Sequence, residues 1–264
     1  MKAKKKDTRF FRIIIPTYNG GKFLPRMVET IRKQSFDDYH LIIVDDQSTD
    51  GTTTEIAESL NPDLLIRMER KGYAAGARNE GMKHFTDDTY TLWFDDDDIL
   101  IDDDALKKLK ECAEANDFPD IIRFNFIKTA LSTGMRGNHH DRYPDPITPA
   151  DICNEVQWGM PWTKAVRSDK CVDFPEELAV DDCFQHIMQC DVCETAAVVH
   201  DDLYEWLVRD ESTTTSKINI RRDSGFYLEV GMLMRKREYM IHDWAREAID
   251  ARIQWIKSRY LRRM

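Results

Sequence analysis

Four short apolar runs in the first hundred residues each end at polar side chains. The runs lie in "FRIII", "LIIV", "DLLI" and "TLWF", and each has the length of a buried strand. Two segments between them have helical spacing: "PRMVETIRKQ", which places Met27, Ile31 and Gln34 on one face, and "TEIAESL". Strand, helix and strand repeated with short links predict an α/β fold, a mostly parallel sheet flanked by helices.

Polar clusters follow three of these runs where each strand is expected to end, at residues 17–19, 45–46 and 95–98. Ligands of open parallel sheets bind at the carboxyl ends of the strands, so the three clusters are expected to meet at one crevice. Residues 95–98 are four consecutive aspartates, whose mutual repulsion opposes ionisation unless a cation or solvent compensates. The segment "GYAAGARNEGMKHF" predicts a glycine-spaced loop that leads into a helix.

The second half of the chain is less regular. "DDDALKKLKECAEAN" predicts a helix and "DIIRFNF" a strand. Residues 129–151 are rich in Gly, Pro, Asn and His and predict a loop. His139 and His140 in this loop are expected to be solvated rather than to bind a metal together, because neighbours in sequence point apart.

From residue 225 onward the pattern is helical. Apolar side chains recur every three or four residues, at Ile241, Trp244, Ala245, Ala248, Ile249, Ile253, Ile256 and Tyr260. The opposite face is rich in Arg and Lys. Two interpretations remain open: the stripe packs on the rest of the chain, or the basic helix rests on an anionic membrane surface.

Composition narrows the class of protein. The 264 residues, 42% hydrophobic and 33% charged, fit either one large globular domain or one domain with an appendage. A formal net charge of −10 argues against nucleic acid as the main partner, because that binding depends on Lys and Arg. No signal peptide or membrane-spanning run is present, which predicts a cytoplasmic protein, peripheral on the inner face of the membrane if the basic helix binds there. The six cysteines contain one C-x-x-C pair without a second, so bystander thiols are expected.

Taken together and in order, "IIIPTYNGGKFLPRMVETIRKQSF", "LIIVDDQSTDGT", "GYAAGARNEGM" and "LWFDDDDIL" resemble the donor-binding half of a family 2 inverting glycosyltransferase of the GT-A fold. The resemblance covers residues 10–110 densely and resumes with "MPWTKAVRS", "FPEELAVDDCFQ" and "LYEWLVRDESTTT". It implies a GT-A domain over residues 1–224, with a nucleotide-sugar half at about 10–110 and an acceptor half at about 111–224. Residues 225–264 would form a C-terminal helical tail.

The resemblance also implies an activity: a sugar moves from a nucleotide diphospho-sugar, with UDP favoured, to an acceptor hydroxyl. The acceptor would be a glycan or a lipid-linked glycan of a bacterial cell surface. Mn²⁺ or Mg²⁺ would neutralise the leaving diphosphate. Two other functions stay open, a sugar-phosphate nucleotidyltransferase and a non-catalytic carbohydrate-binding protein.

The family's D-x-D motif falls on Asp95 and Asp97. The resemblance makes Asp97 and Asp98 the expected metal ligands and Asp95 a nucleotide-sugar contact, while Asp96 is expected to point away. His200 is a candidate third ligand, with a structural histidine as the favoured alternative. A solvated acidic turn is the alternative for the whole cluster.

The remaining donor contacts are carried over in the same way. The resemblance places Pro16, Thr17 and Tyr18 around the base, with Asp46 accepting a hydrogen bond from a uracil-type ring and Asp45 supporting the loop. Arg78 would reach a phosphate or the base, and Arg209, with Ser212 to Thr215, would belong to a flexible segment that closes over the diphosphate, with a solvated loop as the alternative. For Arg78 a structural ion pair with Asp46 or Asp95 is the alternative.

The general base is expected at Asp182 in "VDDCF", with Asp181 in place of the family's usual glutamate. An inverting transferase needs a carboxylate that deprotonates the acceptor hydroxyl. The alternative for Asp182 is a carboxylate that favours a helix dipole, and both can hold together. Trp162 and Lys164 match a segment on the acceptor side, although the Trp is equally well explained as a residue of the hydrophobic core.

Overall fold

A computed structural model describes residues 8–139, 143–144, 146–154, 159–178, 182–209 and 220–258. Its centre is one nine-stranded sheet with the order β3-β2-β1-β4-β8-β6-β9-β5, and β7 pairs with β6. The strands are β1 (Phe11–Thr17), β2 (Tyr39–Asp45), β3 (Leu64–Arg67), β4 (Tyr90–Trp93), β5 (Ile99–Leu100), β6 (Ile121–Ala130), β7 (Met135–His139), β8 (Lys164–Arg167) and β9 (Ala196–Val208).

The four predicted apolar runs form the parallel part of the sheet. β1 pairs in parallel with β2 on one side and β4 on the other, with Ile13 opposite both Leu41 and Leu92. β8 is antiparallel to both of its neighbours, β4 and β6. β6 and its parallel partner β9 therefore run in the same direction as β1. The carboxyl ends of β1, β2, β4, β6 and β9 therefore lie at the same edge of the sheet.

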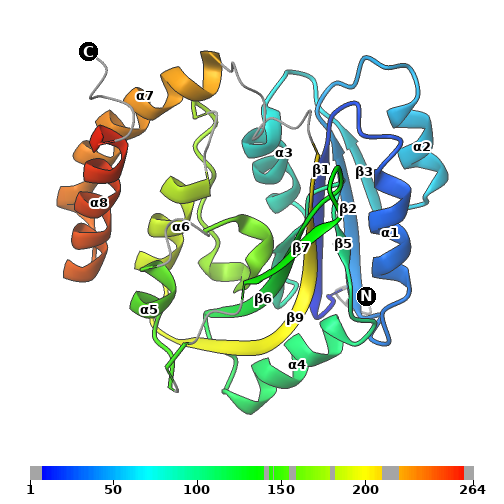
Figure 1. Cartoon of the computed structure of the whole chain (residues 1–264). Helices are drawn as coiled ribbons and strands as arrows, with labels where there is room; N and C mark the ends of the chain where they lie inside the picture. Colours follow the sequence, from blue (N-terminus) through cyan, green and yellow to red (C-terminus); the bar gives the residue numbers. More distant parts are fainter. Residues whose placement is uncertain are drawn as a thin grey trace, which may run out of the picture.

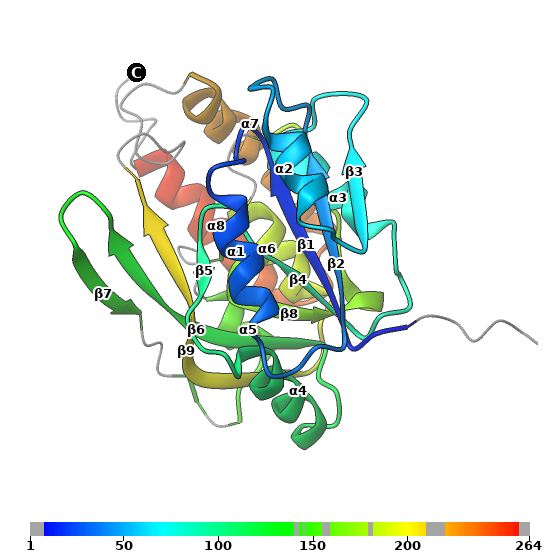
Figure 2. The ribbon, with the colours of Figure 1, turned by 90° about the vertical axis from the view of Figure 1, so that its right-hand side faces the viewer.

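Helices cover both faces of the sheet, which gives three layers (Figures 1 and 2). Alternate residues of β1 belong to separate cores, because successive side chains of a strand point to opposite faces. One core contains side chains of α1 (Leu24–Arg32), α2 (Thr53–Ser59) and α4 (Ala105–Ala115), and the other contains those of α3 (Tyr73–Met82), α5 (Pro149–Cys153), α6 (Asp182–Asp191), α7 (Ile220–Lys236) and α8 (Asp243–Ile256).

Two segments differ from the sequence prediction. Residues 129–151 contain the end of β6, strand β7 and helix α5 rather than loop alone, and helix α3 begins at Tyr73, inside the glycine-spaced segment that was predicted to be loop. β7 forms because residues 126–130 of β6 extend beyond β8 and supply a free edge. The pairing of β7 with β6 cannot be inferred from the spacing of residues within either segment.

The C-terminal segment forms two helices, α7 and α8, instead of one continuous helical run. Between them the carboxylate of Asp191 accepts hydrogen bonds from the backbone N–H groups of Ile241 and His242, at 2.8 and 2.9 Å. The apolar stripe of α8 packs in the second core against α5 and α6. Among the described helices, none combines the length and apolarity that crossing a membrane requires.

Candidate functional site

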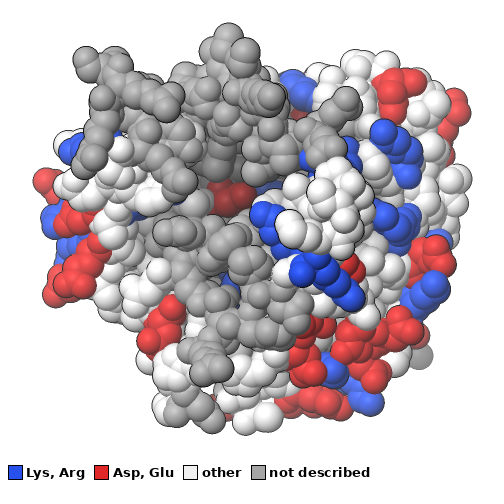
Figure 3. Space-filling model, viewed as in Figure 1, with Lys and Arg blue, Asp and Glu red and all other residues white. Residues whose placement is uncertain are grey.

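The predicted polar clusters meet at the carboxyl edge of the sheet. The loops after β1 and β2 are joined by a hydrogen bond from the N–H of Asp46 to the carbonyl of Thr17, at 2.9 Å. The loop after β4 adjoins them, since Thr17 Oγ1 donates to Asp96 Oδ2 at 2.5 Å. On this face of the molecule acidic side chains are visible in a recess, with Lys and Arg side chains at its border (Figure 3).

Each of the four consecutive aspartates has a different partner. Asp95 accepts from Arg78 Nη2 at 2.8 Å, Asp96 from Thr17, and Asp97 from Arg209 Nη2. Asp98 is 1% exposed and accepts from Tyr204 Oη at 2.9 Å and from the N–H of Leu207 at 2.8 Å. These partners come from α3, from β1 and from the end of β9. The carboxylates of Asp95 and Asp96 are thus held by separate elements, whereas those of Asp97 and Asp98 are both held at the end of β9.

The electrostatics of this loop agree with the expected resistance to ionisation. Burial, with the charge of Asp97 next in importance, raises the pKa of Asp96 to about 7 and that of Asp98 well above its usual range. Burial and the charge of Asp95 raise the pKa of Asp97. Arg209 opposes the rise at Asp97, but burial and the charge of Asp95 outweigh it. A divalent cation would favour the ionised form of all of them.

Three of these carboxylates are suited to a metal ion. One oxygen from each of Asp95, Asp97 and Asp98 lies within 4.8 Å of the others, and carboxylate oxygens are the ligands that Mg²⁺ and Mn²⁺ prefer. Asp96 is not in this group, as predicted, because its carboxylate is turned toward Thr17. His200 is not in it either and lies exposed in β9.

Arg78 links this loop to the predicted base. Its side chain is 4% exposed, its Nη2 donates to Asp95, and its Nη1 lies 3.7 Å from Asp182 Oδ1. The alternative of an ion pair with Asp95 is therefore confirmed, and the same guanidinium also faces the candidate base. Asp182 begins α6 and is partly exposed, so the helix-start interpretation and the base interpretation are compatible. Asp181 lies outside the described residues.

The predicted base-binding residues lie beside this loop. Pro16 and Thr17 are buried, whereas the ring of Tyr18 is 48% exposed and can offer a stacking face. Asp46 is 2% exposed, and its Oδ1 accepts from the N–H of Gly72 at 2.7 Å. Asp45 holds the loop after β2 by accepting from the N–H of Ser48 at 2.8 Å, in agreement with its predicted supporting role.

The predicted acceptor residues Trp162 and Lys164 are buried. The Trp162 ring stacks on Tyr204, with centroids 4.7 Å apart. Lys164 Nζ donates to the carbonyls of Gly159 and Met160 at 2.8 and 3.0 Å and lies 3.2 Å from His186 Nδ1, and burial lowers the pKa of Lys164 to about 7. Their contacts are internal, and their acceptor role stays a prediction that these contacts do not favour. Residues 212–215 lie outside the described residues.

Sequence reasoning did not identify three residues of this region. Tyr204 holds both Asp98 and, through its hydroxyl, the N–H of Asp95 at 3.2 Å. Gly20 leaves room for the aspartate loop, because a Cβ there would lie 1.8 Å from Asp96 Oδ2. Lys71 lies 3.1 Å from Asp46 Oδ2. Lys71 follows the third strand, so the rule that ligands bind at strand ends could have found it.

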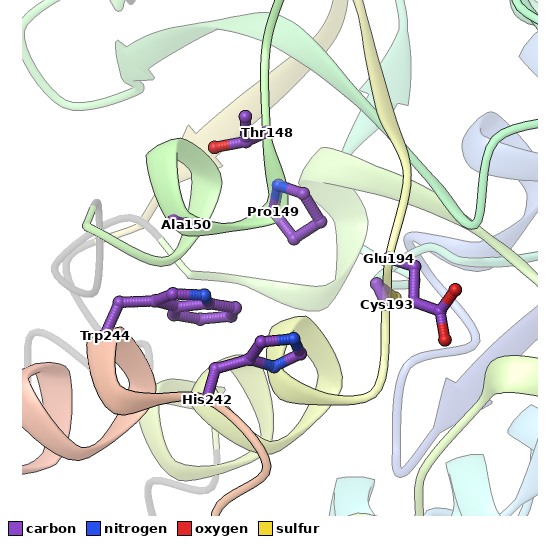
Figure 4. A pocket seen from close by; sticks show the side chains of 7 residues that line it. All are labelled: Thr148, Pro149, Ala150, Cys193, Glu194, His242 and Trp244. Atoms are coloured by element: carbon purple, nitrogen blue, oxygen red, sulfur yellow. The ribbon is translucent and has the colours of Figure 1, made fainter.

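A separate pocket lies at the other end of α6, away from Asp182. Figure 4 shows the rings of His242 and Trp244 on one side of it and Pro149 on the other. Cys193 in its lining is 1% exposed. All six cysteines are free thiols, and burial raises the pKa of Cys183 to about 12, as expected for bystanders.

The order of the strands and the carboxylate loop after β4 define a GT-A fold. Residues 12–153 match the family described as "Glycosyl transferase family 2", so the chain belongs to glycosyl transferase family 2. This confirms the predicted family.

Curated relatives agree with this family. An "Uncharacterized glycosyltransferase" of Haemophilus influenzae is 32% identical over 143 residues, 54% of this chain and 46% of the relative. The "UDP-Glc:alpha-D-GlcNAc-diphosphoundecaprenol beta-1,3-glucosyltransferase WfgD" of Escherichia coli is 30% identical over 96 residues, 36% of this chain and 38% of the relative. The chain spans less than half the length of these two relatives.

Solved structures show the same fold. The structure of S. aureus TarS 1-349 in complex with UDP-GlcNAc superimposes with a TM-score of 0.75 at 20% identity, covering 96% of this chain and 72% of that one. The mannosyltransferase PcManGT of Pyrobaculum calidifontis in complex with GDP-Man and Mn²⁺ has a TM-score of 0.58 at 17% identity, with 96% and 76% covered. At these identities the similarity establishes the GT-A fold alone.

Proposed function

We propose that this chain is a metal-dependent inverting glycosyltransferase that moves a sugar from a UDP-sugar to an acceptor hydroxyl. The observation that carries the proposal is the position of Arg78, which donates to Asp95 of the aspartate loop and faces Asp182 on its other side. A nucleotide sugar bound at the aspartate loop and an acceptor hydroxyl bound near Asp182 would then lie close to each other, on either side of Arg78. The WfgD relative and the TarS complex, both named with UDP-sugars, support a UDP-sugar donor.

The residues have separate parts in the reaction. Asp182 takes the proton of the acceptor hydroxyl as its oxygen attacks the anomeric carbon from the face opposite the diphosphate. The bond from that carbon to the diphosphate oxygen breaks, and the leaving diphosphate keeps the electron pair. Asp97 and Asp98, with Asp95 beside them, would hold Mn²⁺ or Mg²⁺, which supplies charge neutralisation of the leaving group when bound. Arg209 adds a second positive charge at the same place.

Two variants test this assignment with the full chain. Thermal-shift measurements with UDP-, GDP-, CMP- and TDP-sugars, each with and without Mn²⁺, are expected to show the largest stabilisation by a UDP-sugar with Mn²⁺. Asp182→Asn should retain this binding and lose turnover, whereas Asp97→Ala should lose the Mn²⁺-dependent part of binding. Full turnover by Asp182→Asn would remove Asp182 from the mechanism, and an absence of stabilisation by every nucleotide sugar would remove the function.

We further propose a cell-surface or lipid-linked glycan as the acceptor, made at the cytoplasmic face of a membrane. The exposed end of α7 and the turn after it support a membrane contact: Met234, Tyr239 and Ile241 are 59, 78 and 65% exposed, and the last turn of α7 carries Arg235 and Lys236. Apolar and basic side chains together suit an anionic bilayer surface. Sedimentation with phosphatidylglycerol vesicles, absent with phosphatidylcholine vesicles and weakened by Ile241→Asp, tests the contact. Equal recovery with both lipids would contradict it.

A further inference from the structure

The ring of Phe23 lies beside two positive side chains at the aspartate loop. The Cζ of Arg209 lies 4.2 Å from the ring centroid, and the Nζ of Lys22 lies 4.7 Å from it. Within about 6 Å the face of an aromatic ring attracts a cation electrostatically. The same guanidinium donates from Nη2 to the carboxylate of Asp97. Arg209 is thus held by the ring of Phe23 and by the carboxylate of Asp97 together.

The backbone before α1 fixes where this ring lies. The N–H groups of Phe23 and Leu24 both donate to the carbonyl of Gly20, at 2.8 and 3.0 Å. The N–H of Gly21 donates to Thr53 Oγ1 at 2.9 Å. Leu24 is fully buried in the first core. The ring therefore projects from a turn that is anchored on both sides of it.

Burial in the core does not account for an aromatic ring at this position. Phe23 is half-buried, and among the described residues neither core, nor the apolar side chains packed against it, includes Phe23. Its neighbourhood is directed at Asp97 instead. Arg26, three residues later, donates from Nη2 to the backbone carbonyl of Asp97 at 2.9 Å. The start of α1 thus holds Asp97 by its backbone and, through Arg209, by its carboxylate.

We propose that Phe23 is a positioning residue, whose ring holds the guanidinium of Arg209 beside Asp97, where the leaving diphosphate would bind. The inference rests on the proposed function and adds to it a residue that acts through Arg209. A guanidinium carries five N–H groups in a planar fork, so it can meet a carboxylate and phosphate oxygens together. An arginine side chain that is already ordered loses less conformational entropy when the nucleotide binds.

Calorimetric titration of the full chain with UDP and with UMP, each with Mn²⁺, tests the proposal, because only UDP carries a second phosphate. Phe23→Leu keeps an apolar side chain without a ring face and should reduce the UDP-to-UMP affinity ratio by about 3- to 10-fold. Phe23→Met also lacks the ring and should give the same result, whereas Phe23→Tyr keeps the ring and should retain the wild-type ratio.

Phe36→Leu is the matched control. Phe36 is also half-buried, but its ring packs on the rings of Phe10 and Phe11, with centroids 5.8 and 5.9 Å apart. Its replacement removes a ring of the same size from the other end of α1 and should leave the UDP-to-UMP ratio unchanged. A reduction of the ratio by Phe36→Leu equal to that by Phe23→Leu would overturn the inference.

A double-mutant cycle shows whether Phe23 acts through Arg209, since Lys22 lies over the same ring. Arg209→Met should reduce the UDP-to-UMP ratio by about 10- to 100-fold, and Phe23→Leu should then cause no further reduction. A further reduction of the same size would overturn the inference, as would an unchanged ratio in a folded Phe23→Leu protein. Either result leaves the proposed function standing. If the wild type binds neither UDP nor UMP, the proposed function fails and the inference fails with it.

Discussion

Substitution of Gly20 by alanine should disturb the aspartate loop without touching any of its carboxylates. The added Cβ would lie 1.8 Å from Asp96 Oδ2 and 2.6 Å from Thr17 Oγ1, far inside the usual 3.4–4 Å range of van der Waals contact. One of two rearrangements must follow. The Asp96 carboxylate moves away from Thr17, so that a partly buried acceptor loses its hydrogen bond, or the loop after β1 moves. Both routes cost about 1–3 kcal/mol of the free energy of unfolding. The displaced loop should also bind Mn²⁺ and UDP more weakly.

Urea unfolding and calorimetric titration with Mn²⁺ and UDP measure these two effects. Gly137→Ala is the matched control, because no atom lies within 4 Å of a Cβ built at Gly137 and its φ is not positive, so it should not lower stability and should leave the affinities for Mn²⁺ and UDP unchanged. A Gly20→Ala protein with wild-type stability and wild-type affinity would refute the argument from the close approach of Asp96.

Three further changes test other parts of the structure. Tyr204→Phe removes the hydroxyl that donates to Asp98, and we expect a loss of about 1–3 kcal/mol in urea unfolding with weaker Mn²⁺ binding; no change in either would contradict the role of Tyr204. For Lys164 the folded pKa of about 7 lies below the ordinary 10.5, so the unfolded chain holds more protons between these values. Stability should therefore rise with pH there by at most ~1.4 kcal/mol per pH unit, and a Lys164→Met protein with the same slope would show that another group titrates. Gly231→Ala lies within α7 with only Arg235 Nη1 near its Cβ, at 3.8 Å, and should raise stability by about 0.5–1 kcal/mol; a lowered melting temperature would contradict this.

Much of the donor half follows from the sequence because its signals are local. The apolar runs that form β1, β2 and β4 are buried along their length, and each is followed by a polar cluster at the same edge of the sheet. The separation of Asp96 from the other aspartates depends on its contact with Thr17 of β1, because Asp97 and Asp98 are also adjacent in sequence and yet both belong to the carboxylate group.

The features that were missed depend on partners distant in the chain. The turn before α8 is held by the Asp191 carboxylate, about 50 residues earlier, and no Gly or Pro marks it. Trp162 offers the same sequence signal whether it faces a sugar or a core, and only its stacking on Tyr204 shows that it is buried. Spacing cannot reveal such pairs, because it carries information about neighbours on one element and not about which elements meet.

The partners of the aspartate loop also determine when the site can form. Asp98 accepts hydrogen bonds from Tyr204 and Leu207, which lie 106 and 109 positions later in the chain. Asp97 accepts one from Arg209, which lies 112 positions later. Contacts of such sequence separation require a long loop to close, so the native shape of the aspartate loop depends on the end of β9 having joined the sheet. A fragment that stops near residue 110 would carry all four aspartates and the strands that present them, yet lack Tyr204, Leu207 and Arg209. Residues 10–110 are thus continuous in sequence, but the proposed cation site that they carry is completed by groups of β9 and by Arg209, 106 to 112 positions later.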